Sequence, residues 1–291
     1  MTHDESGVVL SAVHLDAPRA PLRIEASGVS ADFRARWNST DLLALSGAKK
    51  GNYVSGLACS DRCLDEVLRL RYEVFNVELG EGLAHSAVTG LDRDEFDDQM
   101  THIVLFDTAG QRVVGTYRVQ TVMHALAHAG IYSAQLFEFA GLDRYYPRMI
   151  EVGRACLAQD HRNLAAIMTL WTGLGEFMNL FDQQFLFGCC SLTTQNPDDG
   201  WRAMKTIRQR KFLHREILLR TRPSHSCGDA AREHDPELGP AIPLPKLFRT
   251  YMHMGAKVIS GPAIDRDFGT VDFLVFMDGK GVSLSSLDIL R

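Results

Sequence analysis

The residues best suited to chemistry in this chain are charged side chains, with one aromatic neighbour, that lie inside otherwise apolar blocks. The set consists of Arg71, Phe75, Asp92, Asp94, Asp97, Arg118, Glu151 and Arg154. Burying such charges is costly unless they pair with each other or with a substrate. The three aspartates, which we call the acidic trio, would bind a cationic amine well. The alternative is an ion-pair network with the arginines that braces the surrounding loops, and both interpretations can hold together.

The pattern of apolar positions predicts the elements that carry these residues. A helix from about Ser60 places Arg71 on its apolar face at 3.6-residue spacing. Further predicted elements are strands at His102–Asp107, Arg112–Val119, Ile150–Leu157 and Gln184–Ser191, a helix at Asn163–Leu180, a helix from Leu244, and a strand at Asp267–Phe276. Residues 1–50 are expected to form a poorly ordered extension, and residues 221–245, rich in Pro, His and charge, a mobile loop.

The charged blocks follow an order that resembles the acyl-carrier-protein-dependent branch of the GNAT-like N-acyltransferases. The blocks are Leu70–Phe75, Asp92–Asp97, Val113–Arg118 and Glu151–Arg154. That branch includes the acyl-homoserine-lactone synthases, the N-acyl amino acid synthases and the ornithine lipid (lyso-ornithine) acyltransferases. The resemblance implies an α/β, GNAT-like fold, with a mixed, mostly antiparallel sheet flanked by helices, over residues 51–291.

Three shorter motifs resemble the ornithine lipid acyltransferases in particular. They are Tyr132-Ser133 with Phe137, Glu151-Val152-Gly153-Arg154-Ala155-Cys156, and Leu170-Trp171. The resemblance implies transfer of a long, 3-hydroxylated acyl group from acyl carrier protein to the α-amine of L-ornithine, which makes lyso-ornithine lipid in bacterial membrane lipid synthesis. Homoserine-lactone synthases usually carry Trp where this chain has Glu81. Such a synthase remains an alternative, as do an N-acyl amino acid synthase with another acceptor and a non-catalytic carrier-protein-binding module.

In that reaction each charged residue has an expected role. The acidic trio would bind the ammonium groups of ornithine, and Arg118 would bind its α-carboxylate bidentately. Glu151, half-buried on a central strand, would accept the amine proton. Asp97 and Arg154 are expected to belong to the catalytic set with Glu151, with Arg154 orienting the acidic loop, while Arg71 and Phe75 belong to the substrate site.

The acyl donor is expected in the gap between two strands. In GNAT folds the strands that correspond to Ile150–Leu157 and Gln184–Ser191 splay apart and bind the pantetheine arm, which would place Cys156 and Leu157 near the thioester. The next turn, which contains Arg162 and Asn163, has no glycine to build a pyrophosphate cradle. Arg162 could still meet the single phosphodiester of a carrier-protein arm. Acyl carrier protein is therefore the expected donor, as a co-substrate and with no bound cofactor.

A basic stretch follows the second of these strands. Arg202, Lys205, Arg208 and Lys211 lie within residues 201–222, which contain one acidic residue. Such a patch on a protein of net charge −5 could dock the acidic carrier protein. A solvated basic face and binding of anionic lipid headgroups are the alternatives.

Composition narrows the remaining classes. The 291 residues are 45% hydrophobic and 23% charged, as in a globular protein with a sizeable core, and the net acidic charge argues against bulk nucleic-acid binding. The acidic start lacks the features of a signal peptide, and no apolar run approaches the length of a membrane span. Six cysteines without a C-x-x-C pair predict no metal site. The expected location is the cytoplasm, with a peripheral contact at the inner membrane.

Overall fold

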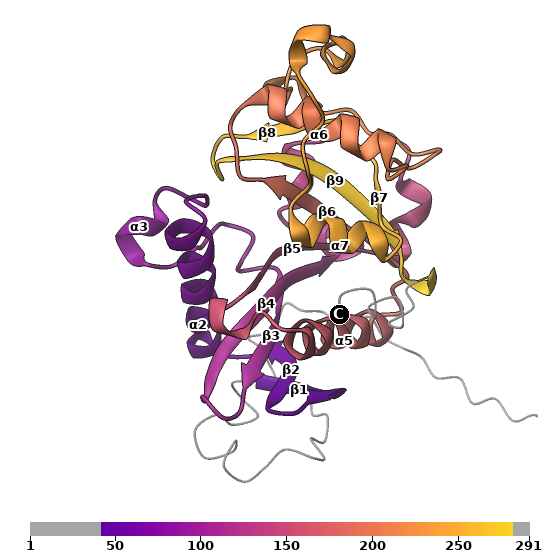
Figure 1. Ribbon diagram of the computed structural model, residues 1–291. Coiled ribbons are helices and arrows are strands. Elements are labelled where there is room, and N and C mark those ends of the chain that lie inside the picture. Colours follow the sequence, from indigo (N-terminus) through magenta and orange to yellow (C-terminus); the bar gives the residue numbers. More distant parts are fainter. Residues whose placement is uncertain (1–41, 282–291) are drawn as a thin grey trace, which may run out of the picture.

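A nine-stranded sheet runs through residues 42–281, which are the residues that the computed structural model describes (Figure 1). The strands are β1 (Leu42–Lys50), β2 (Tyr53–Ala58), β3 (Thr101–Asp107), β4 (Arg112–Thr121), β5 (Met149–Leu157), β6 (Phe185–Leu192), β7 (Lys257–Val258), β8 (Ala263–Asp265) and β9 (Thr270–Asp278). Their order is β1-β2-β3-β4-β5-β6-β9-β7, and β8 pairs with β9. Neighbours are antiparallel except β5 and β6, so the predicted mixed, mostly antiparallel sheet is confirmed.

Helices cover both faces of this sheet. They are α2 (Asp61–Tyr72), α3 (Ser86–Thr89), α4 (Val122–Ala127), α5 (Leu164–Leu180), α6 (Pro197–Gln209) and α7 (Lys246–His253), with the π-helix η1 (Glu73–Glu78) directly after α2. Short 3₁₀ turns complete the connections: η2 (Tyr132–Gln135), η3 (Asp143–Arg148), η4 (Gln159–His161), η5 (Pro223–His225), η6 (Ala230–His234), η7 (Pro236–Leu238) and η8 (Gly279–Gly281). None of the helices in the described part of the chain is long and apolar enough to cross a membrane.

Side-chain alternation along the strands defines the two faces. Phe273 of β9 packs against Phe248 of α7, with ring centroids 5.9 Å apart, and Trp171 of α5 lies 6.1 Å from Tyr251 of α7. We call this side the α5 face. Leu274, the next residue of β9, belongs to a separate apolar cluster beneath α4 and η2 on the opposite side, which we call the α2 face.

The helix that carries the first arginine forms as its sequence predicts. Ser60 caps α2, because its hydroxyl accepts a hydrogen bond from the Cys63 N–H at 3.2 Å. The apolar side of α2 is buried, and Arg71 is buried with it. The chain continues into η1 without a break, and Phe75 of η1 is buried too.

Two boundaries differ from the expectation. Residues 42–50, assigned to the poorly ordered extension, form β1, which pairs with β2. Leu42, Leu45 and Ala48 of β1 are buried, and contacts with the adjacent strand β2 and with α5, far along the chain, hold the strand in place. The rest of the predicted extension lies outside the described residues. The loop at 221–245 contains η5, η6 and η7, and ion pairs and hydrogen bonds attach it to α6.

Candidate active site

The sheet opens between β5 and β6. The two strands pair only at Met149–Phe185, Ile150–Leu186 and Glu151–Phe187. Gly188 marks a last close approach, because a Cβ at this position would lie 2.1 Å from the Val152 carbonyl oxygen. On its other edge β5 bulges between Gly153 and Cys156, where Arg154 has a φ of 49°. The predicted splaying is confirmed, and it exposes the backbone of β5 beyond Val152.

A cavity of about 580 Å³ occupies this opening. Residues 152–155 of β5 and 186–191 of β6 line its middle. Tyr117 and Arg118 of β4 show how the cavity relates to the two faces. Tyr117 lines the cavity and accepts a hydrogen bond from Trp171 on the α5 face, whereas the next residue, Arg118, bonds to the acidic trio on the α2 face. The cavity also includes Arg154, a partner of the trio, and therefore passes through the sheet.

The end of the cavity on the α2 face carries three buried carboxylates. Glu81, Asp265 and Asp272 line it and are 9%, 8% and 4% exposed. Asp272 accepts a hydrogen bond from the Thr270 hydroxyl at 2.9 Å, and Glu81 accepts one from Thr193 at 2.9 Å. Within residues 42–281 none of the three has an ion-pair partner. A buried carboxylate without a cation is a ready partner for a cationic ligand.

Burial changes the ionisation of two of these groups. It raises the pKa of Asp272 to about 7, and the neighbouring carboxylate of Asp265 adds to the effect. It also raises the pKa of Glu81, against the hydrogen bond from Thr193 and the charge of Arg154. A carboxylate that titrates near pH 7 has the pKa that a general base needs at neutral pH.

The end of the cavity on the α5 face is apolar. Leu174 and Met178 of α5, Phe248 of α7, Met254 just after α7, and Met277 of β9 line it. Such a lining suits a hydrocarbon chain, because burying each methylene contributes about 0.8 kcal/mol. The cavity thus joins a charged end and an apolar end through the gap between β5 and β6.

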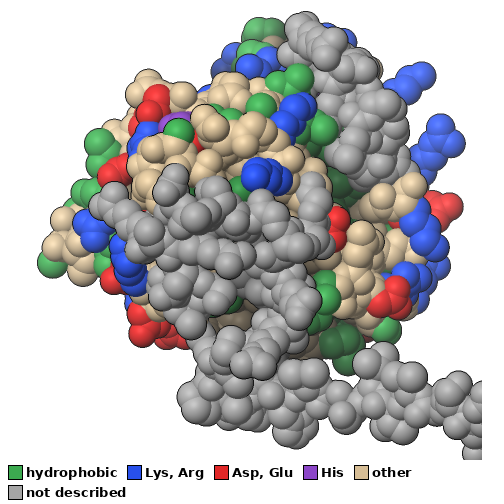
Figure 2. Space-filling model, turned by 90° about the horizontal axis from the view of Figure 1, so that it is seen from below, with side chains coloured by type: hydrophobic (Ala, Val, Ile, Leu, Met, Phe, Trp, Pro, Cys, Tyr) green, Lys and Arg blue, Asp and Glu red, His purple; other side chains and the backbone are tan. Residues whose placement is uncertain are grey.

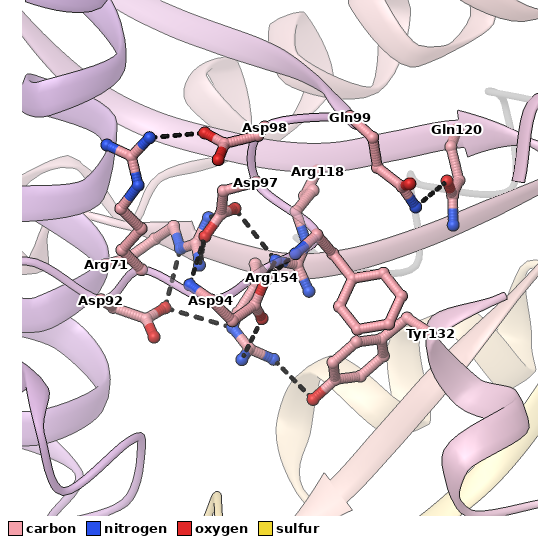
Figure 3. Close-up of polar contacts among 12 residues, drawn as sticks. Arg71, Asp92, Asp94, Asp97, Asp98, Gln99, Arg118, Gln120, Tyr132 and Arg154 are labelled. Atoms are coloured by element: carbon pink, nitrogen blue, oxygen red, sulfur yellow. Dashed lines mark hydrogen bonds and ion pairs between the residues drawn. The ribbon is translucent and has the colours of Figure 1, made fainter. Parts of the chain in front are cut away.

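The acidic trio and the three arginines form a closed ring of ion pairs (Figure 3). The six pairs, with N–O distances from 2.5 to 3.1 Å, are Arg71–Asp92, Arg71–Asp97, Arg118–Asp94, Arg118–Asp97, Arg154–Asp92 and Arg154–Asp94. Each aspartate pairs with two arginines, each arginine pairs with two aspartates, and the formal charges cancel. The ring joins α2 and the Asp-rich loop to β4 and β5, which is the bracing network that the sequence suggested as an alternative.

This geometry argues against amine binding by the acidic trio. Burial alone would raise the pKa of Asp97, but Arg118 and Arg71 outweigh it and hold the pKa below its ordinary value. Asp92 shows the same balance, with Arg154 and Arg71 as its cations. Of the six ring members, Arg154 lines the cavity. The trio is therefore already neutralised away from the cavity.

The predicted roles of the arginines divide in the same way. Arg118 is 1% exposed and lies within the ring, with its guanidinium 5.0 Å from the centre of the Tyr132 ring, so it is not placed to bind the acceptor carboxylate. Arg71 is fully buried in the ring. Arg154 orients the acidic loop as predicted, through Asp92 and Asp94. Its contacts, including one with the Tyr132 hydroxyl at 3.1 Å, use three of the five N–H groups of a guanidinium.

Glu151 is not placed to accept a proton from a substrate. Its side chain is 2% exposed and lies outside the cavity lining. One carboxylate oxygen accepts hydrogen bonds from Gln120 and the Tyr132 N–H at 2.8 and 2.9 Å, and the other accepts them from the Ser133 N–H and hydroxyl. These four hydrogen bonds fix the position of the carboxylate, which therefore anchors η2 beside β5. Phe75, in contrast, does line the cavity and packs on Phe268 at 5.4 Å.

The predicted donor-binding residues lie next to the cavity rather than in it. The exposed part of β5 is Val152–Ala155, so Cys156 and Leu157 lie just beyond the lining, where β5 pairs with β4. Arg162 forms a two-pronged ion pair with Glu78. Asn163 caps α5 by accepting a hydrogen bond from the Ala166 N–H at 3.0 Å. These contacts already occupy part of the helix terminus that would cradle a pyrophosphate.

The basic residues expected to dock a carrier protein are engaged to different degrees. Arg202 donates to the Pro240 carbonyl at 3.0 Å and pairs with Asp199 within α6, Lys205 donates to the Gly239 carbonyl, and Arg208 pairs with Glu233. The first three therefore help to attach the 221–245 loop to α6. Lys211 is exposed just after α6. Docking by these residues stays a prediction, and Lys211 is the member best placed for it. Figure 2 shows Lys and Arg side chains interspersed with Asp and Glu side chains at the edges of the face seen from below.

Asp265 and Asp272 were not predicted from the sequence, and Glu81 was noted only as the position where homoserine-lactone synthases usually carry Trp. Asp272 lies inside the apolar run of β9, so the criterion that singled out Arg71, a charge on an apolar element, would have found it. Glu81 follows a glycine in a loop and Asp265 ends a short strand, and neither position carries a periodic signal. Only the packing of β8, β9 and the loop after η1 brings the three together.

Comparisons with known proteins agree with this architecture. A family model described as an acetyltransferase (GNAT) domain matches residues 70–172. The chain is 29% identical over 250 residues to the L-ornithine N(alpha)-acyltransferase of Agrobacterium fabrum, with 80% of this chain and 83% of the relative covered. It is 28% identical over 221 residues to the enzyme of that name from Rhodobacter capsulatus, with 74% and 85% covered. FeeM, an N-acyl amino acid synthase from uncultured soil microbes, superposes with a TM-score of 0.47 at 12% identity, covering 81% of this chain and 97% of that one.

The open sheet and the matching domain define a protein of the GNAT fold. With the similarity to curated N-acyltransferases over most of its length, the chain is an N-acyltransferase.

Proposed function

We propose that this enzyme transfers a long acyl group from acyl carrier protein to the α-amine of L-ornithine and releases lyso-ornithine lipid. The observation that carries the proposal is the cavity through the sheet, with carboxylates and Arg154 at one end and an apolar pocket at the other. The names of the curated relatives support ornithine as the acceptor. A product with one side-chain ammonium, one carboxylate and one acyl chain matches both ends of the cavity.

The acceptor has a complementary group for each of its charges. Arg154 has N–H groups left to bind the α-carboxylate. Glu81 and Asp265 take the side-chain ammonium, which supplies the cation that these buried carboxylates lack. Asp272 lies beside the gap between β5 and β6. In the sheet it is paired, from β9, with Ser191 of β6, which also lines the cavity.

The chemistry requires one proton acceptor and no covalent enzyme intermediate. The neutral α-amine attacks the thioester carbon, the C–S bond breaks, and the pantetheine sulfur leaves as a thiolate that finally takes up the proton released by the amine. Asp272 receives the proton that the nitrogen loses. The backbone of β5 at 153–155 supplies N–H donors for the developing oxyanion. The α-amine is preferred because its ordinary pKa, ~8 in peptides, is below the ~10 of a side-chain amine.

Two features favour acyl carrier protein over coenzyme A as the donor. The turn before α5 has no glycine, and its polar residues are already bonded: Asp160 to Arg112, Arg162 to Glu78, and Asn163 to the helix N-terminus. A pyrophosphate would have to displace these contacts. A single phosphodiester needs fewer donors, so the carrier-protein arm is the better fit.

The product bears a single acyl chain and partitions into a bilayer, so we expect the reaction to occur beside the inner membrane. Leu247 of α7 lines the cavity and is 36% exposed, with Lys246 and Arg249 exposed beside it. A peripheral contact of α7 with an anionic surface would receive the product.

The acceptor is tested by offering the purified enzyme a long-chain acyl carrier protein with ornithine, lysine, tyrosine and S-adenosylmethionine in turn, and by reading the products by tandem mass spectrometry. Ornithine acylated on its α-nitrogen is the expected main product. Glu81→Gln and Asp265→Asn should raise KM for ornithine more than KM for the donor, whereas the exposed Asp267→Asn should leave both unchanged. Product from another acceptor, with none from ornithine, would refute the proposal.

A further inference from the structure

The guanidinium of Arg154 lies over an aromatic ring at the charged end of the cavity. Its Cζ is 4.1 Å from the centre of the Phe268 ring. Its hydrogen bonds go to Asp92, Asp94 and the Tyr132 hydroxyl (Figure 3). Stacking of a guanidinium on an aromatic face is attractive, and it is stronger where water is excluded. Phe268 is 7% exposed, so little water reaches this contact.

The ring and the three hydrogen bonds together fix the plane of the guanidinium. That plane determines where the unused N–H groups of Arg154 point. The bonds use the N–H of Nε, one N–H of Nη1 and one N–H of Nη2. One N–H therefore remains on each terminal nitrogen, and such a pair can hold both oxygens of one carboxylate. Binding of this kind depends on the orientation of the plane, so a tilt of the guanidinium weakens it.

The backbone of Arg154 does not fix this orientation by itself. Its φ of 49° lies in the left-handed region, where residues other than glycine are uncommon, and it belongs to the bulge of β5. Such a conformation persists only where surrounding contacts hold it. Phe268 is the nearer of the two aromatic neighbours of the guanidinium, since the centre of the Tyr132 ring is 5.2 Å from Cζ.

The backbone of Phe268 contacts the other residues assigned to the acceptor. Its N–H donates to Asp265 Oδ1 at 2.9 Å. Its carbonyl accepts a hydrogen bond from the N–H of Gly82, the residue after Glu81, at 2.7 Å. A substitution of the side chain leaves these backbone groups in the chain, so it tests the effect of the ring on Arg154 separately from them.

We propose that Phe268 is a positioning residue for the carboxylate of the acceptor, which it orients through Arg154. The proposal rests on the proposed function in one respect, that Arg154 binds this carboxylate. It is independent of the acyl donor.

The test compares kcat/KM for ornithine and for ornithinamide, in which a neutral amide replaces the carboxylate. The wild type should prefer ornithine by on the order of 30-fold, the scale of hydrogen bonds between charged groups. Phe268→Leu should lower this preference about tenfold, the scale of a desolvated cation–π contact. The loss should come from a higher KM for ornithine, while KM for the acyl donor and kcat/KM for ornithinamide stay unchanged.

Two further variants serve as controls. Phe268→Tyr keeps an aromatic ring under the guanidinium and should keep the wild-type preference. Phe139→Leu makes the same change as Phe268→Leu at a ring outside the cavity lining, and it should keep the preference too. If Phe268→Leu is not recovered folded, Phe268→Met, which also removes the ring, takes its place.

Three results would overturn the assignment. A wild-type preference that survives in Phe268→Leu would show that the ring does not orient Arg154. Equal losses with ornithine and ornithinamide would make Phe268 a packing residue only. Equal use of the two acceptors by the wild type would remove carboxylate recognition altogether, although ornithine would still be acylated. If another amino acid proves to be the acceptor, its acid and amide forms give the same comparison, so the two proposals fail separately.

Discussion

Aspartates in this enzyme occupy two opposite electrostatic states. Asp97 lies between Arg71 and Arg118, which keep it ionised, whereas Asp272 lies in the cavity without a cation and has its pKa raised to about 7. Both are buried, so exposure does not distinguish them. The neighbouring cations do. The sequence signal of a charge in an apolar block therefore finds both kinds of residue but cannot say which kind is which.

The role of Asp272 gives a pH prediction. A general base works in its ionised form, so kcat/KM should rise with pH through about 7, the pKa of Asp272 in the free enzyme. Asp272→Asn should lower kcat by about 100-fold, within the usual range for loss of general base catalysis, and should remove that limb of the profile. Asp267→Asn, in the exposed turn before β9, should keep both the rate and the profile. A limb that survives in Asp272→Asn would assign the titration to another group.

At the scale of elements, the sequence pattern predicted the secondary structure correctly wherever contacts within one segment determine it. The cap at Ser60, the buried side of α2, the hairpin of β3 and β4, and α5 all follow from spacing and propensity. β1 was not predicted, because its hairpin with β2 contains a register shift between Ala44 and Lys49 that breaks the alternation of apolar residues, and because its packing on α5 is a tertiary contact. Glu151 was misread for the same reason. The four hydrogen-bond donors to its carboxylate come from β4 and η2, and the residues next to Glu151 in the sequence do not indicate that these donors will be there.

The ion-pair ring should be a strong brace between elements. In Asp97→Asn the buried guanidiniums of Arg71 and Arg118 lose a shared counter-charge, so the free energy of unfolding should fall by about 3–5 kcal/mol. Denaturant unfolding measures this loss. Asp98→Asn is the control, because its pair with Arg93 is solvent-exposed, and it should cost less than about 1 kcal/mol. Similar small losses in both variants, with activity lost only in Asp97→Asn, would instead return the acidic trio to the catalytic site.

At the scale of the whole molecule, the active site depends on segments far apart in the chain. The carboxylates come from the loop after η1, from β8 and from β9, and the acyl pocket comes from α5, α7 and β9. β9 contributes to both ends, since Asp272 lies on one face and Met277 on the other. The segments after β6 that contain α7, β8 and β9 are therefore part of the candidate site, whereas the family-model match at residues 70–172 includes β5 but not β6, β8 or β9.

Recognition of the acyl donor involves the outer surface of the protein as well as the cavity. An acyl carrier protein should be used at least tenfold better than the acyl-coenzyme A with the same chain. The turn before α5 has no place for a pyrophosphate, while Lys211, just after α6, is exposed to an acidic partner.

Lys211→Glu should raise KM for the carrier-protein donor, since a surface contact with the carrier contributes only to the encounter of the two proteins. It should not change KM for a short pantetheine thioester or the rate of the chemical step. Arg69→Glu makes the same charge change on the exposed side of α2 and should alter neither value. Equal kcat/KM for the two natural donors would rule out carrier-protein preference. An unchanged KM in Lys211→Glu would move the docking surface away from the end of α6, and the basic residues of that helix would then serve only to hold the 221–245 loop.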